Sequence, residues 1–206
     1  MPSLTPSFVR RTLLPVTYLI FLAGMLISAA IFYRGKPFDA KQAVLSDLQS
    51  PDENPHGFGA SAAGTGISAI LLAPAVQLFY RRLRPQKPRL ATAGAVTFAV
   101  GLACAIAVGV LAPFTHGYTP LHVQLASAAF VGVSAGTLLY LFAVRAAPAL
   151  LATQLSVLAL LVFLCYGPVN FDNSRLLTSL AFSEWVLCTN CAATLWLLSK
   201  SIDTAK

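Results

Sequence analysis

Charged side chains are scarce in this sequence. Only 10% of the 206 residues are Asp, Glu, Lys or Arg, whereas soluble domains carry roughly 25%. The chain is instead 57% hydrophobic, with a mean hydropathy of +0.73. So little charge cannot cover a water-facing surface. The composition therefore excludes an ordinary soluble domain and predicts a polytopic membrane protein.

The short motifs of common enzymes are also missing. No serine lies in the G-x-S-x-G pattern of a nucleophile elbow, and no glycine-rich stretch follows a strand, as a phosphate-binding fingerprint requires. All four cysteines lie in apolar runs. Cys188 and Cys191 form a C-x-x-C, but no second Cys or His pair stands near them to complete a zinc site. We interpret these cysteines as small packing residues, and the sequence identifies no metal or cofactor.

The net charge of +7 does not indicate a nucleic-acid partner. Lys and Arg lie in short clusters between apolar runs, without interleaved exposed aromatic residues, whereas nucleic-acid binding needs a continuous basic face. No internal repeat suggests an inverted-repeat transporter. The positive charge is instead informative about membrane topology.

Six apolar windows are long enough to cross a membrane, because about 20 helical residues span the hydrocarbon core. They are Thr12–Tyr33, Phe58–Tyr80, Leu90–Pro113, Leu121–Val144, Ala149–Gly167 and Leu176–Ser199. We interpret the first window as a retained span, since it is longer than a signal-peptide core and no small-x-small cleavage site follows it. The sequence therefore predicts an all-α bundle of six transmembrane helices, with residues 1–206 forming a single membrane domain.

The loops between the windows differ in positive charge. The N-terminal tail, the loop 81–89, Arg145 and the C-terminal end hold ten Lys or Arg residues. The opposite side, which includes the loop 34–57, holds four: Arg34, Lys36, Lys41 and Arg175. The positive-inside rule then places both termini in the cytoplasm. The basic cytoplasmic loop is expected to contact anionic lipid headgroups through Arg81, Arg82, Arg84, Lys87 and Arg89.

Acidic and histidine side chains gather on the predicted outer side. This outer polar cap comprises Asp47, Asp52, Glu53, His56 and Asp172. Paired carboxylates can share a proton or bind a cation, but charges in a polar loop are also commonly just solvated. The stretch SPDENPHG reads equally well as a turn. The sequence leaves these alternatives open.

Three residues at the outer ends of the windows are candidates for chemistry. Glu184 lies eight residues into the sixth window, about 12 Å deep at 1.5 Å per residue. An ionised carboxylate there costs on the order of 2–3 kcal/mol, so it must find a partner inside the bundle. His116 and His122 could each act as a base, a metal ligand or a headgroup contact, or could simply cap a helix. A structural role for Glu184 is as well supported as a functional one.

Small residues recur at helix-contact spacing within the windows. Gly94, Gly101 and Gly109 lie in the third, and Ala128, Gly132 and Gly136 stand four residues apart in the fourth. Such residues let helix backbones approach closely. We expect them to pack helices within the bundle, or against a protein partner or a second copy of the chain. Asn190, in the sixth window, is expected to form a hydrogen bond across helices.

Several local motifs resemble those of a known membrane family. SDLQSPDENPHGFGASAAG stands between the first two windows, VGVLAPFTHGYTPLHVQLASAAF joins the third and fourth, and FSEW lies in the sixth. Together they resemble the six-span family that includes the DRAM autophagy modulators, the Frag and Sfk membrane proteins, the N-terminal domain of Cwh-type proteins and related six-span domains of unknown function. The matching positions are Ser46, Asp47, Pro51, Pro113, His122, Glu184 and Trp185.

The resemblance implies a role in lipid organisation, glycolipid-anchor remodelling or autophagy. The chain departs from the animal members, whose loop often carries a cysteine, and it shows no extra C-terminal domain of the Cwh type. The family also supplies no agreed catalytic mechanism. The resemblance therefore implies membrane lipids as partners and a location in the plasma membrane or an endomembrane. It does not imply a defined reaction.

Three hypotheses about function remain open at this point. The leading one is a non-catalytic, lipid-handling or regulatory protein whose outer polar cap contacts headgroups. The second is a membrane-embedded enzyme acting on a lipid or lipid anchor, with Asp47, His116, His122 and Glu184 as catalytic residues. The third is a small transporter or channel with Glu184 in a proton or cation path.

Overall fold

The computed structural model describes residues 4–39, 44–114, 119–146, 148–166, 175 and 179–204, with the side chains of 161–166 and 203–204 not described. Every regular element within these residues is helical. The helices are α1 (Pro6–Phe8), α2 (Leu14–Phe32), α3 (Leu45–Leu48), α4 (Phe58–Leu83), α5 (Pro88–Leu111), α6 (Pro120–Ala143), α7 (Pro148–Tyr166) and α8 (Leu180–Thr204). A π-helical turn, Val9–Leu13, joins α1 to α2 without a break. The predicted all-α fold is confirmed.

Five helical stretches are long and apolar enough to cross a membrane. They are Pro6–Phe32, Phe58–Leu83, Pro88–Phe114, Pro120–Ala143 and Leu180–Ile202. The remaining long helix, α7, has 19 residues and occupies the fifth predicted window. The apolar helices are those of an integral, multi-pass membrane protein, while the sixth span stays a prediction.

Proline marks the beginning of several of these helices. Pro88, Pro120 and Pro148 are the first residues of α5, α6 and α7. Proline suits this position because its fixed φ matches the helix and its missing N–H would have no partner there. The Thr119 side chain also accepts the backbone N–H of His122, at 3.3 Å, and so caps α6. These local signals explain why the helices begin where they do.

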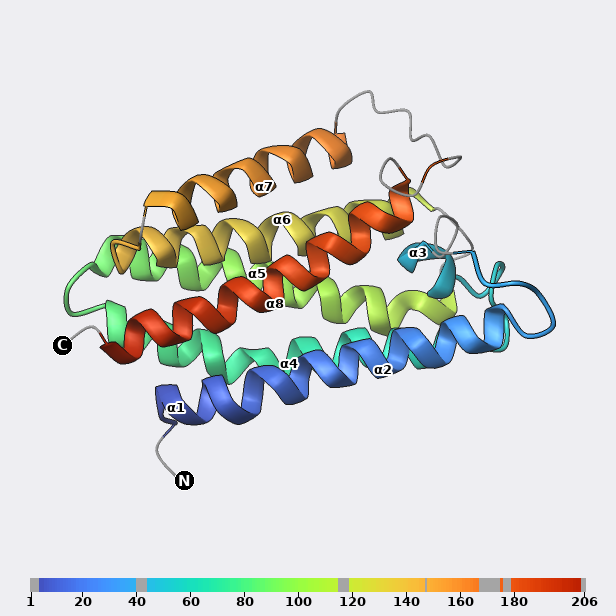
Figure 1. Cartoon of the computed structure of the whole chain (residues 1–206), viewed down its shortest axis with the longest axis horizontal. Helices are drawn as coiled ribbons and strands as arrows, with labels where there is room; N and C mark the ends of the chain where they lie inside the picture. Colours follow the sequence, from blue (N-terminus) through green and yellow to red (C-terminus); the bar gives the residue numbers. More distant parts are fainter. Residues whose placement is uncertain are drawn as a thin grey trace.

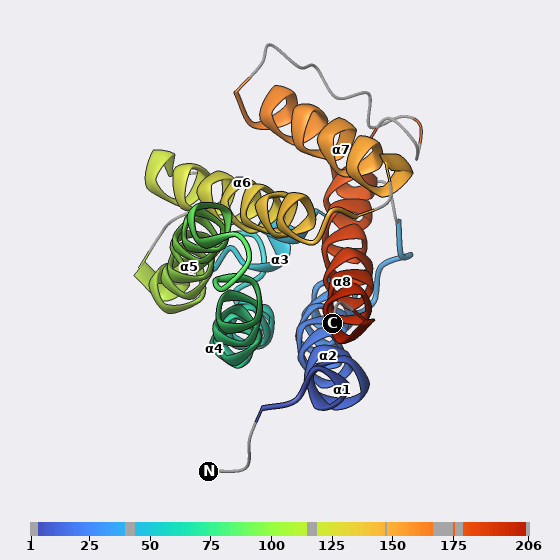
Figure 2. The same ribbon diagram turned by 90° about the vertical axis from the view of Figure 1, so that its left-hand side faces the viewer.

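The long helices run along one axis of the molecule, with the two ends of the chain at the same end (Figure 1). The short helix α3 lies at the opposite end, beside the C-terminal end of α2 and the beginning of α8. Viewed along the axis, α7 lies at the outside of the bundle, against α6 (Figure 2). The helices α2, α4, α5, α6 and α8 form the rest of the bundle.

Glycines allow consecutive helices to approach closely. A Cβ added to Gly24 of α2 would lie 2.9 Å from the Cα of Gly64 in α4. One added to Gly109 of α5 would lie 2.6 Å from the carbonyl oxygen of Ala62 in α4. One added to Gly101 of α5 would lie 2.6 Å from the backbone nitrogen of Val133 in α6. The predicted packing role is confirmed for Gly101 and Gly109.

At the end of the bundle near the chain termini, the core is formed by buried aliphatic and aromatic side chains. Phe79 of α4 and Tyr140 of α6 are fully buried and meet edge to face, with ring centroids 5.7 Å apart. The Tyr140 hydroxyl donates to the carbonyl oxygen of Val76 at 3.3 Å, so this buried polar atom has a partner. The α2, α4, α5, α6 and α8 helices all contribute to this cluster.

Polar side chains attach α8 to its neighbours. Gln154 of α7 donates to Thr194 of α8 at 2.6 Å and exchanges hydrogen bonds of 3.2 Å with Asn190. The Tyr18 and Thr189 hydroxyls lie 3.1 Å apart and link α2 to α8. Within a membrane such bonds contribute roughly 0.6–1.7 kcal/mol each. The predicted cross-helix bond of Asn190 is confirmed.

Candidate functional site

The segment 44–57 folds into the end of the bundle. Leu45 and Leu48 are buried against Met25 and Ala29 of α2. The carbonyl oxygen of Leu48 accepts the hydroxyls of Ser28, at 2.8 Å, and Ser61, at 2.7 Å. Because these two serines belong to α2 and α4, α3 is joined to both helices by buried hydrogen bonds. We call this segment the α3 plug.

Asn54 organises the second half of the α3 plug. Its side chain is 2% exposed, and its Nδ2 lies 2.8 Å from the Ser28 hydroxyl and 3.3 Å from the Leu48 carbonyl oxygen. Gly57 packs directly on this amide, since a Cβ at that position would lie 2.6 Å from Asn54 Nδ2. The turn predicted from SPDENPHG is thus built around a buried asparagine.

The predicted outer polar cap divides into two groups in the structure. Asp52, Glu53 and His56 are exposed on the α3 plug. Asp47 is half-buried and lies close enough to Glu184 and Tyr33 to interact electrostatically. Asp172 lies outside the described residues. The charged side chains of the α3 plug are thus exposed or half-buried, whereas several of its Leu, Gln, Ser and Asn side chains are buried.

Tyr33, just beyond the C-terminal end of α2, lies beneath the loop that leads to the α3 plug. Its hydroxyl donates to the backbone oxygen of Asp39 at 3.2 Å. Burial, together with the nearby carboxylates of Asp39 and Asp47, raises the pKa of Tyr33 above its ordinary value. The phenol therefore remains protonated at physiological pH and acts as a hydrogen-bond donor.

Glu184 connects α8 to the α3 plug. Its Oε2 accepts the backbone N–H of Leu45 at 2.6 Å, and the backbone amide of Ser46 also faces the carboxylate. Because α8 begins at Leu180, Glu184 lies about 6 Å from the helix start, at 1.5 Å per residue. The predicted depth of about 12 Å was counted from Leu176, outside the described helix, and stays a prediction. The expected partner inside the bundle is present, and it is a backbone amide.

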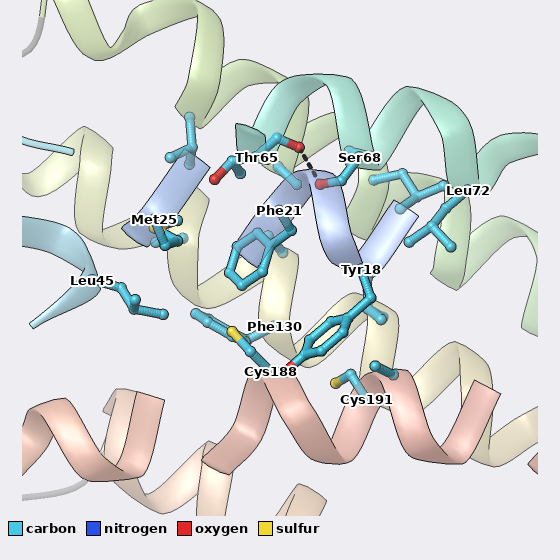
Figure 3. A pocket seen from close by; sticks show the side chains of 18 of the residues that line it. Tyr18, Phe21, Met25, Leu45, Thr65, Ser68, Leu72, Phe130, Cys188 and Cys191 are labelled. Carbon is cyan, nitrogen blue, oxygen red and sulfur yellow. Dashed lines mark hydrogen bonds between the residues drawn. The ribbon is translucent and has the colours of Figure 1, made fainter. Parts of the chain in front are cut away.

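A cavity of about 200 Å³ lies among α2, α4, α5, α6 and α8. Figure 3 shows Tyr18, Phe21 and Met25 of α2 pointing into it, opposite Cys188 and Cys191 of α8. Most of the wall is apolar. The polar lining residues nearest the α3 plug are Ser46, Gln49, Thr65, His122 and Glu184. The cavity therefore has a polar end and a mostly apolar body, in which Thr17, Tyr18 and Ser68 are the polar exceptions.

His122 lines this cavity, and its ring has no hydrogen-bond partner among the described residues. The residue is 5% exposed and lines the wall near the beginning of α6. Within the described part of the chain, no hydrogen bond reaches its imidazole nitrogens, although buried polar groups are normally bonded. Thr17, on α2, likewise has a buried hydroxyl without a partner among the described residues and lines the same cavity.

The structure brings together some of the predicted site residues. Glu184, His122 and Ser46 line one cavity, and Asp47 lies beside Glu184 without belonging to the cavity wall as described. His116 lies outside the described residues. Gln49, whose Nε2 donates to Thr65 at 2.6 Å, was not predicted. The only signal for it is its position one residue after Leu48, inside a motif that already contained Ser46 and Asp47.

Metal ligation has no clear location in the described residues. No three His, Cys, Asp or Glu side chains within them lie close enough to share an ion. Cys104, Cys188 and Cys191 are free thiols, and Cys191 contacts the Ser134 hydroxyl at 3.6 Å. Cys188 and Cys191 line the cavity wall, where they supply soft, apolar surface.

The basic loop lies at the opposite end of the molecule from the α3 plug. Arg81, Arg82, Arg84 and Arg89 are exposed there and Lys87 is half-buried. Arg84 stands over the Tyr80 ring at 5.6 Å, which holds one guanidinium near the end of α4. The positive charges therefore project away from the cavity and its acidic end.

Comparison with known proteins gives no family assignment. No family model, no curated protein and no solved structure matches the chain. The resemblance carried by the loop motifs consequently stays a prediction, and the function has to be argued from the geometry of the bundle.

Proposed function

We propose that this protein crosses the membrane six times and binds a membrane lipid inside its helix bundle without transforming it. Lipid binding is supported by the distribution of polar and apolar residues in the cavity wall. The wall along α2, α4, α6 and α8 is mostly apolar, with Thr17, Tyr18 and Ser68 as exceptions, and five polar residues lie at the end beside the α3 plug. A molecule with an apolar chain and a polar head matches such a cavity. The chain would lie against the apolar wall, and the head would form hydrogen bonds with the polar residues.

Binding is better supported than catalysis. A general base needs a hydrogen bond, direct or through one water, to the group that it deprotonates or that orients it. In the described residues the His122 ring forms no such bond, and the Glu184 carboxylate is engaged by the Leu45 amide. These groups are placed to hold a polar head, and they do not form a nucleophile–base pair.

The basic loop fits a second contact with lipid at the other membrane surface. Basic residues near an anionic leaflet contribute about 1 kcal/mol each, and this loop carries five of them. With the loop in the cytoplasm, the α3 plug and the polar end of the cavity face the opposite side. A regulatory protein that senses lipid in one leaflet and anchors to the other is consistent with this arrangement.

Replacing Ala192 by phenylalanine is expected to remove the bound lipid. Ala192 lines the cavity from α8, so the larger ring would occupy space that the chain of the lipid needs. Native mass spectrometry of protein released from lipid nanodiscs would count retained lipid molecules. The matched control is Ala193→Phe, because the neighbouring Ala193 is exposed on the same helix and does not line the cavity. Equal lipid retention by the two variants would contradict the proposal.

The proposed topology predicts opposite accessibility for two single cysteines. Asp52 lies on the exposed face of the α3 plug, and Gln86 is exposed in the basic loop. In intact cells a membrane-impermeant maleimide should label Asp52→Cys, while Gln86→Cys should react only after permeabilisation. The unmodified chain provides the background, because three of its cysteines lie within apolar helices. Labelling of both variants from one side would rule out this topology.

A further inference from the structure

We infer that the ligand of the cavity is a single-chain amphiphile with a cationic, hydrogen-bond-donating head, of which a long-chain primary amine is the simplest example. This inference rests on the proposed lipid-binding function and specifies its ligand. It follows from three features of the cavity: the acceptors at its polar end, the absence of positive charge in its described wall, and its dimensions.

The polar end of the cavity is rich in acceptors. Glu184 contributes a carboxyl group, and the Asp47 side chain lies close enough to interact with it electrostatically. A neutral imidazole has one acceptor nitrogen, and the His122 ring has no protein partner in the described chain. The Gln49 amide donates to Thr65 through Nε2, which leaves its carbonyl oxygen as an acceptor. A head that brings several N–H donors would satisfy these groups together.

The charged residues near the cavity favour a ligand with a positively charged head. No Lys or Arg is found among the described residues that line the cavity. An anionic head would meet Glu184 and Asp47 without a compensating cation, and like charges in a site of low dielectric repel strongly. A primary ammonium would pair with the Glu184 carboxylate and carries three donors for the remaining acceptors.

The cavity has the length of one medium alkyl chain. On each of α2, α6 and α8 the first and last lining residues are eleven positions apart, from Leu14 to Met25, from His122 to Val133 and from Glu184 to Leu195. At 1.5 Å per residue this is about 16 Å. Carbon–carbon bonds of about 1.5 Å advance an extended chain by about 1.3 Å per methylene. The whole cavity, polar end included, therefore has the length of an extended chain of on the order of 12 carbons.

The volume favours one chain over two. At about 200 Å³ the cavity is larger than the roughly 150 Å³ engineered cavity that binds benzene. It remains below the roughly 300 Å³ at which drug-sized pockets begin. A two-chain phospholipid would leave one of its chains outside the cavity, whereas a single chain would fill the cavity.

Three ligands that share a twelve-carbon chain test the inference. Dodecylamine, dodecanol and dodecanoate would each be added at the same mole fraction to nanodiscs of a zwitterionic two-chain lipid that hold the full-length protein. Adducts would be counted by native mass spectrometry. We expect dodecylamine to bind at least about tenfold more tightly than dodecanoate, which corresponds to one charge-assisted hydrogen bond, with dodecanol between them.

The Glu184→Gln variant tests the residue that would recognise the head. Glutamine can still accept the Leu45 amide but carries no charge, so the preference for dodecylamine over dodecanol should be lost. A purely structural role would weaken binding of all three ligands equally. Glu53→Gln, which removes an exposed acid from the α3 plug, should leave all three unchanged.

Each outcome has a distinct meaning. Binding of dodecanoate equal to or tighter than that of dodecylamine would overturn the inference about the head, while lipid binding itself would stand. Absence of adducts with all three ligands would overturn the inference about the single chain. Equal lipid retention by the Ala192→Phe and Ala193→Phe variants would instead remove the proposed function from which this inference starts.

Discussion

Replacing Gly101 by valine is expected to lower the free energy of unfolding by about 3 kcal/mol, near the upper end of the usual cost of overpacking. At this position α5 and α6 are in backbone contact. A Cβ on Gly101 would lie 2.6 Å from the backbone nitrogen of Val133 and 2.9 Å from the carbonyl carbon of Gly132. Backbone atoms cannot change rotamer, so the two helices would have to separate.

This effect should appear in unfolding of the purified protein from mixed micelles, followed by circular dichroism. Gly59→Val is the matched control, because a Cβ on Gly59 meets no atom within 4 Å. The control should unfold close to the unmodified protein. A Gly101→Val variant as stable as the Gly59→Val variant would show that α5 and α6 are not in contact at this position.

Replacing Asn54 by leucine is expected to cost about 2–3 kcal/mol and to release the α3 plug from the bundle. The substitution removes the donor to the Ser28 hydroxyl and to the Leu48 carbonyl oxygen, and it sets an apolar side chain among buried polar atoms. Leaving a buried polar group without its partner costs about 1–3 kcal/mol. Because the packing around Gly57 also depends on this amide, the whole turn should loosen.

Hydrogen exchange followed by mass spectrometry would localise this change. Backbone amides of residues 44–57 should exchange faster in Asn54→Leu, while those of the long helices should keep their protection. The control is Asp52→Leu, which alters an exposed residue of the same segment. Unchanged exchange over 44–57 in the Asn54 variant would mean that the asparagine does not hold the α3 plug in place.

The helices could be predicted from the sequence because each depends on a local property. Apolar windows of about 20 residues have few alternatives to a spanning helix, and the prolines at 88, 120 and 148 start helices by their own geometry. The packing role of Gly101 followed from its spacing in the same local way. Such features need no knowledge of which helix lies next to which.

The α3 plug could not be predicted with the same reasoning. A stretch with Asp47, Asp52 and Glu53 resembles a solvated loop, and the burial of Asn54 depends on Ser28, which is 26 residues away. Leu45 and Leu48, three residues apart, were the available signal for a short helix with one apolar face. Their partners in α2 become known only from the tertiary structure.

The cavity was beyond sequence-based prediction for a related reason. Glu184 could be expected to need a partner, but its bond to Leu45 connects residues 139 positions apart. A cavity, moreover, is the space that packed side chains leave unfilled, so it reflects how five helices meet and not the composition of any one of them. Part of the chemistry of its polar end could therefore be predicted from the sequence, whereas its shape could not.

The bond between Leu45 and Glu184 also has a consequence for biogenesis. Leu45 leaves the ribosome 139 residues before Glu184, which belongs to α8. At about 5–20 residues per second, the amide of Leu45 must wait on the order of 10 s for its acceptor. Until α8 has been synthesised, the Leu45 amide lacks this acceptor, so the order of translation sets when the α3 plug can bond to α8.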